Sequence, residues 1–184
     1  MVEGLSRLFV AVPLTDEARH ALSATILQAA PHGLPGRAVR PPNWHLTLRF
    51  LGDAGSVGKD RISAALDQAD LGPAFSMVWG GLGAFPRPQR ATVLWVGADR
   101  GGDDLERLAG TVEAAAQEAG FPIEERPFQP HLTLSRIRPH QDVGPLLATD
   151  RPGVPMEVGR IVLYRSHLGR GGARYEEIEE FPLG

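Results

Sequence analysis

The sequence predicts an α+β protein with largely antiparallel sheets, arranged as two pseudo-equivalent lobes in one domain of residues 1–184. Two observations predict this class. Helix-like stretches and β-hairpins are mixed along the chain, which favours antiparallel sheets. The tetrapeptide His-Leu-Thr-Leu occurs twice, at residues 45–48 and 131–134, which suggests one copy in each lobe. Of the 184 residues, 42% are hydrophobic, which is enough to form one compact folded unit.

The first half of the chain predicts strand, helix, strand and helix. Residues 7–14 are apolar and rich in strand-forming side chains, so they predict a central strand. Thr15 and the two acids that follow it predict the start of a helix that extends to residue 30. A proline-rich loop then leads to the strand of the first motif, residues 44–51, and a second helix is expected over residues 56–70.

The second half predicts a hairpin, a helix, the strand of the second motif, a short helix and a final hairpin. In chain order, these elements are expected at residues 75–85 with 91–97, at 103–119, from 131 onward, at 143–149, and at 156–167 with 173–181. Trp79 and Trp95 are expected in the core rather than on a base-stacking surface.

Each copy of the motif alternates in polarity and follows a proline, as expected for the start of a strand. Because residues two apart share a face of a strand, His45 and Thr47 are expected to point one way and the two leucines the other. His131 and Thr133 repeat the pattern. Continued alternation places Arg49 on the face of His45 and Thr47, where we expect it to bind substrate.

Two imidazoles and two hydroxyls in one cleft suit acid–base chemistry on a phosphate. A neutral imidazole can accept a proton from water, and an imidazolium can give one to a leaving group. Both forms coexist near neutral pH because the ordinary pKa of histidine is about 6.5. The threonine hydroxyls can donate hydrogen bonds to phosphate oxygens as charge develops on them. A single His-x-Thr is more often structural, but two copies on equivalent faces favour a function.

Composition and charge exclude several other classes. The chain has no cysteine, hence no thiolate metal site, and its six histidines lack the spacing of a metal motif. No apolar run approaches the length of a membrane span. The net charge of −3 predicts that any nucleic-acid contact is local. We therefore expect a cytoplasmic monomer that uses neither metal nor cofactor.

With both motifs in hand, the chain resembles the LigT-like two-histidine phosphoesterases. More narrowly, it resembles the RNA 2′,3′-cyclic phosphodiesterases, formerly called 2′-5′ RNA ligases. The resemblance covers nearly the full length. The stretches that carry it are residues 7–14, 43–53 (Asn-Trp-His-Leu-Thr-Leu-Arg-Phe-Leu-Gly-Asp), 85–88, 128–136 (Phe-Gln-Pro-His-Leu-Thr-Leu-Ser-Arg), 163–166 and 175–181.

The resemblance implies two pseudo-symmetric lobes whose sheets line a central V-shaped cleft, with the helices outside. It implies metal-independent opening of an RNA-terminal 2′,3′-cyclic phosphate to a 2′-phosphate. By position, His45 matches the general acid that protonates the leaving 3′-oxygen, and His131 matches the general base that activates water. Thr47 and Thr133 match the donors to the phosphate oxygens.

Arg136 matches a basic residue that contacts the phosphate in some members of the family. Strict alternation places Arg136 on the opposite face from His131 and Thr133, so a strand end or a bulge would have to re-aim it. Alternation instead places Ser135 on the histidine face.

Several alternatives remain open from the sequence. Reversal of the same chemistry would join RNA ends through a 2′-5′ linkage, and we expect only weak ligation, because the chain has no nucleotide-binding Gly-Lys-Ser/Thr loop. Another cyclic phosphate, such as that of ADP-ribose, is an alternative substrate. A module that binds nucleotides or RNA without turnover is a further alternative, from a different functional class.

Overall fold

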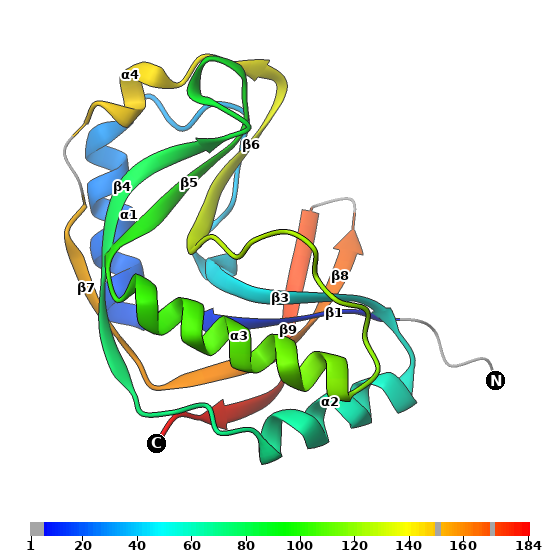
Figure 1. Ribbon diagram of the computed structural model, residues 1–184. Coiled ribbons are helices and arrows are strands. Elements are labelled where there is room, and N and C mark those ends of the chain that lie inside the picture. The colour runs from blue at the N-terminus through cyan, green and yellow to red at the C-terminus, as the bar shows by residue number, and fades with distance from the viewer. Residues whose placement is uncertain (1–5, 150–151, 170–171) are drawn as a thin grey trace.

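The computed structural model describes residues 6–149, 152–169 and 172–184 (Figure 1). Within this part of the chain lie two antiparallel sheets, with helices packed outside them. This arrangement confirms the predicted α+β class and the two lobes. Each lobe is defined here by its sheet.

The first lobe contains four strands in the order β3-β1-β8-β9. The bounds of these strands are Ser6–Pro13 for β1, His45–Ala54 for β3, Arg160–Gly169 for β8 and Gly172–Pro182 for β9. The first motif therefore opens β3, the strand at one edge of the sheet. The chain between residues 14 and 45 carries α1, the short strand β2 and a 3-10 turn, Pro41–Asn43.

The second lobe contains five strands in the order β2-β6-β5-β4-β7. The bounds are Arg37–Ala38 for β2, Phe75–Phe85 for β4, Ala91–Arg100 for β5, His131–Gln141 for β6 and Val154–Val158 for β7. The second motif opens β6, which pairs with β5 on one side and with the two-residue β2 on the other.

The helices are α1 (Asp16–Ala29), α2 (Ser56–Gln68), α3 (Gly102–Glu118) and α4 (Gly144–Leu147). As expected, Thr15 caps α1, since its Oγ1 accepts a hydrogen bond from the Ala18 N–H at 3.2 Å. Two of the helices contact the lobe other than the one whose strand precedes them: α1 follows β1 but contacts β7, and α3 follows β5 but contacts β3, whereas α2 follows β3 and contacts that same sheet (Figure 1). The lobes are therefore interlocked.

One main hydrophobic cluster joins both sheets. It includes Val10 and Leu46 of the first lobe and Trp79 and Leu132 of the second, all at most 1% exposed. Because removal of apolar surface from water drives folding, this shared core favours folding of the two lobes as one unit. No helix in the described residues is long and apolar enough to cross a membrane.

The structure corrects one predicted strand. The apolar stretch at residues 156–167 was expected to be continuous, but it is divided at Gly159 into β7 and β8, which belong to different sheets. The periodicity does not reveal this because both strands are buried and apolar. The final hairpin, β8 with β9, is confirmed, although residues 170–171 of its turn lie outside the described residues.

Candidate active site

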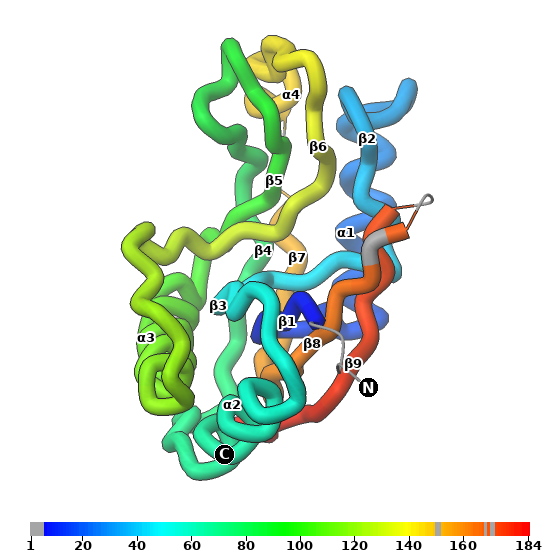
Figure 2. Tube along the Cα trace, turned by 90° about the vertical axis from the view of Figure 1, so that its right-hand side faces the viewer, coloured from blue at the N-terminus to red at the C-terminus, as the bar shows by residue number. Residues whose placement is uncertain are grey.

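The two motif strands meet at the junction of the lobes. Residues of β3 contact residues of β6, and Figure 2 shows β6 extending upward and β3 lying below it. Leu46 and Leu132 are fully buried, whereas the histidine and threonine of each motif are half-buried. The motif side chains therefore take the orientation that alternation predicts.

Both motif strands contain a bulge at the same place, the second leucine of the tetrapeptide. In the first lobe, consecutive residues Val10 and Ala11 of β1 pair with Arg49 and Thr47, which leaves Leu48 as the extra residue. In the second lobe, consecutive residues of β5 pair with Ser135 and Thr133, which leaves Leu134 extra. A bulge of one residue exchanges the faces of all later side chains.

The expectation that Arg49 points into the cleft is therefore wrong. Its side chain is buried on the opposite face, where its guanidinium forms an ion pair with Glu113 of α3. It also donates to the carbonyls of Phe50 and Pro122. Ser135 was likewise expected beside His131, but it is fully buried and donates to the Pro35 carbonyl.

The same bulge turns Arg136 toward the cleft. Arg136 pairs with Val93 and Thr133 pairs with Trp95, so both side chains lie on one face of the second sheet. Strict alternation would have turned Arg136 away. In the first lobe the equivalent position is Phe50, which is 53% exposed. The positive charge of Arg136 contributes to lowering the pKa of both motif histidines, which indicates that it lies near both rings.

The two imidazoles are oriented in the same way by the backbone. The Nδ1 atom of His45 lies 2.9 Å from the Asn43 carbonyl oxygen, and that of His131 lies 2.7 Å from the Gln129 carbonyl oxygen. A carbonyl oxygen can only accept, so Nδ1 carries the hydrogen in both rings. Nε2 is left as a proton acceptor in the neutral ring and a donor in the charged ring.

Aromatic side chains surround each histidine. The ring of His45 lies 4.8 Å from that of Phe9 and 4.9 Å from that of Tyr175, which it meets edge-on. The ring of His131 meets Phe85 edge-on at 5.2 Å and Trp95 at 6.2 Å. Trp95 is thus half-buried on the cleft face, contrary to the expectation of a core residue, whereas Trp79 is fully buried.

This environment disfavours the charged form of both imidazoles. Burial lowers the pKa of His45 to about 4, and the charges of Arg136 and His131 add to the effect, while the hydrogen bond to Asn43 opposes it. The pKa of His131 is also lowered, first by burial and then by Arg136. Without ligand, both rings are therefore mainly neutral at pH 7.

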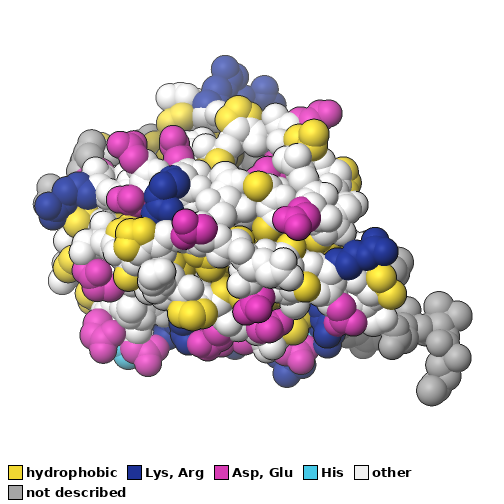
Figure 3. Space-filling view, turned by 60° about the horizontal axis from the view of Figure 1, so that its bottom comes forward, with side chains coloured by type: hydrophobic (Ala, Val, Ile, Leu, Met, Phe, Trp, Pro, Cys, Tyr) yellow, Lys and Arg dark blue, Asp and Glu magenta, His cyan; other side chains and the backbone are white. Residues whose placement is uncertain are grey.

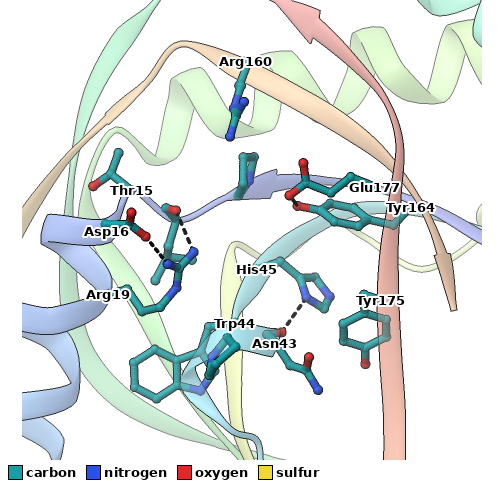
Figure 4. A pocket seen from close by; sticks show the side chains of 13 residues that line it. Thr15, Asp16, Arg19, Asn43, Trp44, His45, Arg160, Tyr164, Tyr175 and Glu177 are labelled. Atoms are coloured by element: carbon teal, nitrogen blue, oxygen red, sulfur yellow. Dashed lines mark hydrogen bonds and ion pairs between the residues drawn. The ribbon is translucent and has the colours of Figure 1, made fainter. Parts of the chain in front are cut away.

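A pocket of about 330 Å³ opens beside His45 (Figure 4). Tyr164 and Tyr175 line it, and Figure 4 shows both rings close to His45. The Tyr164 hydroxyl donates to Glu177 at 3.3 Å. Burial and the Glu177 charge raise the pKa of Tyr164, so it stays protonated near neutral pH.

The sequence analysis assigned no role to these tyrosines. The one available signal was alternation in β9, which places Tyr175 and Glu177 on one face. Among the described residues, no group of three or more acidic or histidine side chains could hold a metal ion.

Comparison with known proteins identifies the family. The sequence model of the family described as LigT like Phosphoesterase matches the chain twice, over residues 12–95 and 96–175, with one motif in each match. The chain belongs to the LigT-like phosphoesterase family. Each match contains one bulged motif strand, although each also contains strands of both sheets.

Relatives of this LigT-like phosphoesterase are similar along nearly its full length. A protein of Escherichia coli named RNA 2′,3′-cyclic phosphodiesterase is 32% identical over 181 residues, covering 96% of each chain. One of the same name from Archaeoglobus fulgidus is 33% identical over 179 residues, covering 95% of this chain and 99% of the other. The crystal structure of E. coli LigT complexed with 3′-AMP matches with a TM-score of 0.81 at 29% identity, covering 97% and 98% of the two chains.

Proposed function

We propose that this LigT-like phosphoesterase hydrolyses the terminal 2′,3′-cyclic phosphate of RNA to a 2′-phosphate without a metal ion. One observation carries the proposal: two imidazoles on contacting strands each have Nδ1 tied to the backbone and Nε2 left for chemistry. The names of the relatives in E. coli and A. fulgidus support RNA 2′,3′-cyclic phosphate as the substrate.

In the proposed reaction His131 is the base and His45 the acid. Nε2 of His131 removes a proton from water, whose oxygen attacks phosphorus. The bond from phosphorus to the 3′-oxygen breaks, and Nε2 of His45 gives its proton to that oxygen. One imidazole is charged before the step and the other after it, so the proton count balances.

The other polar groups of the cleft stabilise the transition state. The hydroxyls of Thr47 and Thr133 donate to the non-bridging oxygens, on which negative charge builds up. The Arg136 guanidinium adds a positive charge to the same site. The assignment of acid to His45 rests on family resemblance, since the two tetrapeptides are identical.

Substrate binding also favours the protonated form of His45, which the acid role requires. An acid whose pKa is about 4 carries little proton at pH 7. A bound phosphodiester brings a negative charge that offsets the charge of Arg136 and favours the imidazolium form of His45. Protonation of the acid is thereby coupled to the presence of substrate.

Ligation follows from the same residues. If the 5′-hydroxyl of a second RNA replaces water as the nucleophile, His131 removes its proton and its oxygen attacks the 2′,3′-cyclic phosphate. The bond from phosphorus to the 3′-oxygen breaks, His45 protonates that oxygen, and a 2′-5′ linkage forms without ATP. Because water at high concentration competes, we propose that ligation is weak. Incubation of an RNA that ends in a 2′,3′-cyclic phosphate with an RNA that has a 5′-hydroxyl end measures it, and a ligation yield above hydrolysis at low RNA concentration contradicts this ranking.

The deciding experiment uses a short RNA that ends in a 2′,3′-cyclic phosphate, incubated with the protein in excess chelator. His45→Ala and His131→Ala are compared with His32→Ala, the same substitution at an exposed residue outside the site. We expect a 2′-phosphate from the unmutated protein and from His32→Ala alone. A 3′-phosphate product would mean that the 2′-oxygen is the leaving group, so the acid and base roles of the two histidines would have to be reassigned. No turnover of any cyclic phosphate would support the binding module.

A further inference from the structure

Arginines in the two lobes differ in their surroundings. In the first lobe, Arg7 and Arg160 lie within 4 Å of carboxylates, and so does Arg165. In the second lobe, several arginines on β2, β6 and the β4–β5 turn form no ion pair with any described carboxylate; they are Arg37, Arg87, Arg90, Arg136 and Arg138. Arg174 of the first lobe also forms no ion pair with a described carboxylate, and Arg37 and Arg136 lie nearer the cleft. Arg87 and Arg90 lie close together in the sequence on the β4–β5 turn, so positive charge without a carboxylate partner is found there in a protein whose net charge is −3.

A hollow of about 390 Å³ lies within this group, at the free end of the second lobe. Pro86, Arg87, Arg90 and Thr92 from the β4–β5 hairpin line it, together with His140 near the end of β6. The Thr92 hydroxyl donates to the Phe85 carbonyl at 3.3 Å. No carboxylate lines the hollow; its lining includes two guanidinium groups and an imidazole, although most of its surface is apolar.

Two segments connect the hollow to the active-site cleft. On β6, Arg136 precedes His140 by four positions, so the two residues are at most roughly 13 Å apart along the chain, and the register of β6 against β5 shifts between them. On β4, the ring of Phe85 contacts His131 at 5.2 Å, and Arg87 follows two residues later. Arg138 lies between Arg136 and His140 and is exposed.

We propose that this hollow binds a backbone phosphate of the RNA, a few nucleotides upstream of the cyclic phosphate in the cleft. The inference rests on the proposed function and extends it, because it predicts that the enzyme prefers an RNA strand to a cyclic mononucleotide. Guanidinium groups without carboxylate partners match a phosphodiester in charge and in hydrogen-bond geometry. The reacting phosphate is held by the motif residues and Arg136, so the hollow serves a second phosphate.

The rest of the surface would guide the strand to this end of the molecule. Figure 3 shows that acidic side chains are numerous on the face that carries α2 and α3, while a group of basic side chains stands at its upper edge. A polyanion is repelled by the former and attracted by the latter. This face therefore disfavours contact with RNA except at that edge.

The test compares a nucleoside 2′,3′-cyclic monophosphate with RNAs that end in the same cyclic phosphate and are lengthened one nucleotide at a time. The double variant Arg87→Gln/Arg90→Gln is measured beside Arg61→Gln/Arg100→Gln, a matched pair of exposed arginines, on α2 and at the far end of β5, that also form no ion pair with a described carboxylate. For the unmutated protein, we expect kcat/KM to rise once the RNA is long enough to reach the hollow.

The hollow variant should lose this rise, by about tenfold, and keep unchanged activity on the mononucleotide. Its plot of log kcat/KM for the long RNA against log salt should flatten by about 0.7, the contribution of one phosphate on single-stranded nucleic acid. The control pair should match the unmutated protein on every substrate. His140→Gln should give a smaller loss, confined to the same RNA lengths.

The outcomes separate the two proposals. If the unmutated protein turns over neither substrate, the proposed function fails. If it hydrolyses both, but the hollow variant keeps the full preference for long RNA, the inference about the hollow is wrong and the function stands. An equal loss on the mononucleotide and the long RNA would also overturn the inference, since the effect would then arise in the cleft.

Discussion

The two motif strands share a tetrapeptide and a bulge but differ in the two residues that follow. In β3 these residues are Arg49 and Phe50, and in β6 they are Ser135 and Arg136. Because the bulge exchanges faces, the first residue of each pair turns inward and the second turns toward the cleft. The tetrapeptides supply matched acid–base groups. The residues that follow make the lobes unequal, because the first lobe presents the aromatic ring of Phe50 to the cleft and the second lobe presents the cation of Arg136.

On the buried face, each motif strand forms a hydrogen bond to the segment of chain that precedes the other motif strand. Arg49 of the first motif strand binds the Pro122 carbonyl, in the segment that leads to His131. Ser135 of the second motif strand binds the Pro35 carbonyl, in the segment that leads to His45. Each motif strand therefore helps to position the opposite histidine, which couples the geometry of the two lobes.

The largest expected difference between the lobes concerns the cleft-facing residues. Arg136→Ala should lower kcat/KM by about 100-fold, because it removes the positive charge that stabilises the negative charge developing on the phosphate. Arg136→Lys should restore part of the loss, and Phe50→Ala should cost less than Arg136→Ala. Steady-state kinetics on the cyclic mononucleotide measure these effects without interference from the hollow. A greater loss from Phe50→Ala would reverse the assigned contributions of the lobes.

The inner residues should differ in stability rather than in chemistry. Arg49→Met removes the ion pair with Glu113 and the donors to the Phe50 and Pro122 carbonyls, and should lower the free energy of unfolding by about 3 kcal/mol. Ser135→Ala removes one neutral hydrogen bond and should cost about 1 kcal/mol. Urea unfolding measures both. Addition of Glu113→Gln to Arg49→Met should recover part of the loss, and failure to do so would mean that packing, not charge, dominates.

The histidines should differ in their effect on acid stability. The pKa of His45 falls from 6.5 unfolded to about 4 folded, so its neutral form stabilises the fold above pH 6.5 and this contribution is lost as the pH falls toward 4. His45→Gln should therefore reduce the acid loss of unfolding free energy by roughly 2 kcal/mol, allowing for its partial exposure. His131→Gln acts in the same direction. Urea midpoints at pH 7 and pH 4.5 check this, and parallel curves for His45→Gln and the unmutated protein would contradict it.

The smallest expected difference concerns the residues two positions before each histidine. The Asn43 side chain donates to the Ala173 carbonyl of β9 at 2.9 Å, whereas the Gln129 side chain has no hydrogen bond to a described residue. Loss of one such bond is worth about 1 kcal/mol, so Asn43→Ala should lower kcat about fivefold and shift the pH limb of His45. Gln129→Ala should leave both unchanged. Equal effects would show that the two backbone carbonyls are held equally well without the Asn43 side chain.

The sequence by itself determined the order of most elements, the two lobes and the orientation of the motif residues. Alternation of two residues is a local property, and Leu46 and Leu132 lie in the core as it predicts. The cap at Thr15 and the final hairpin were also predicted, because each depends on residues close together in the sequence.

Only the tertiary structure decided the faces of Arg49, Ser135 and Arg136, because a bulge depends on the register against β1 and β5 rather than on the strand's own residues. It also brought Tyr175 of β9 against His45, 130 positions earlier in the chain, and placed α1 and α3 on opposite lobes. These features depend on long-range packing in a shared core. A local pattern in the sequence does not indicate which distant segment packs against it.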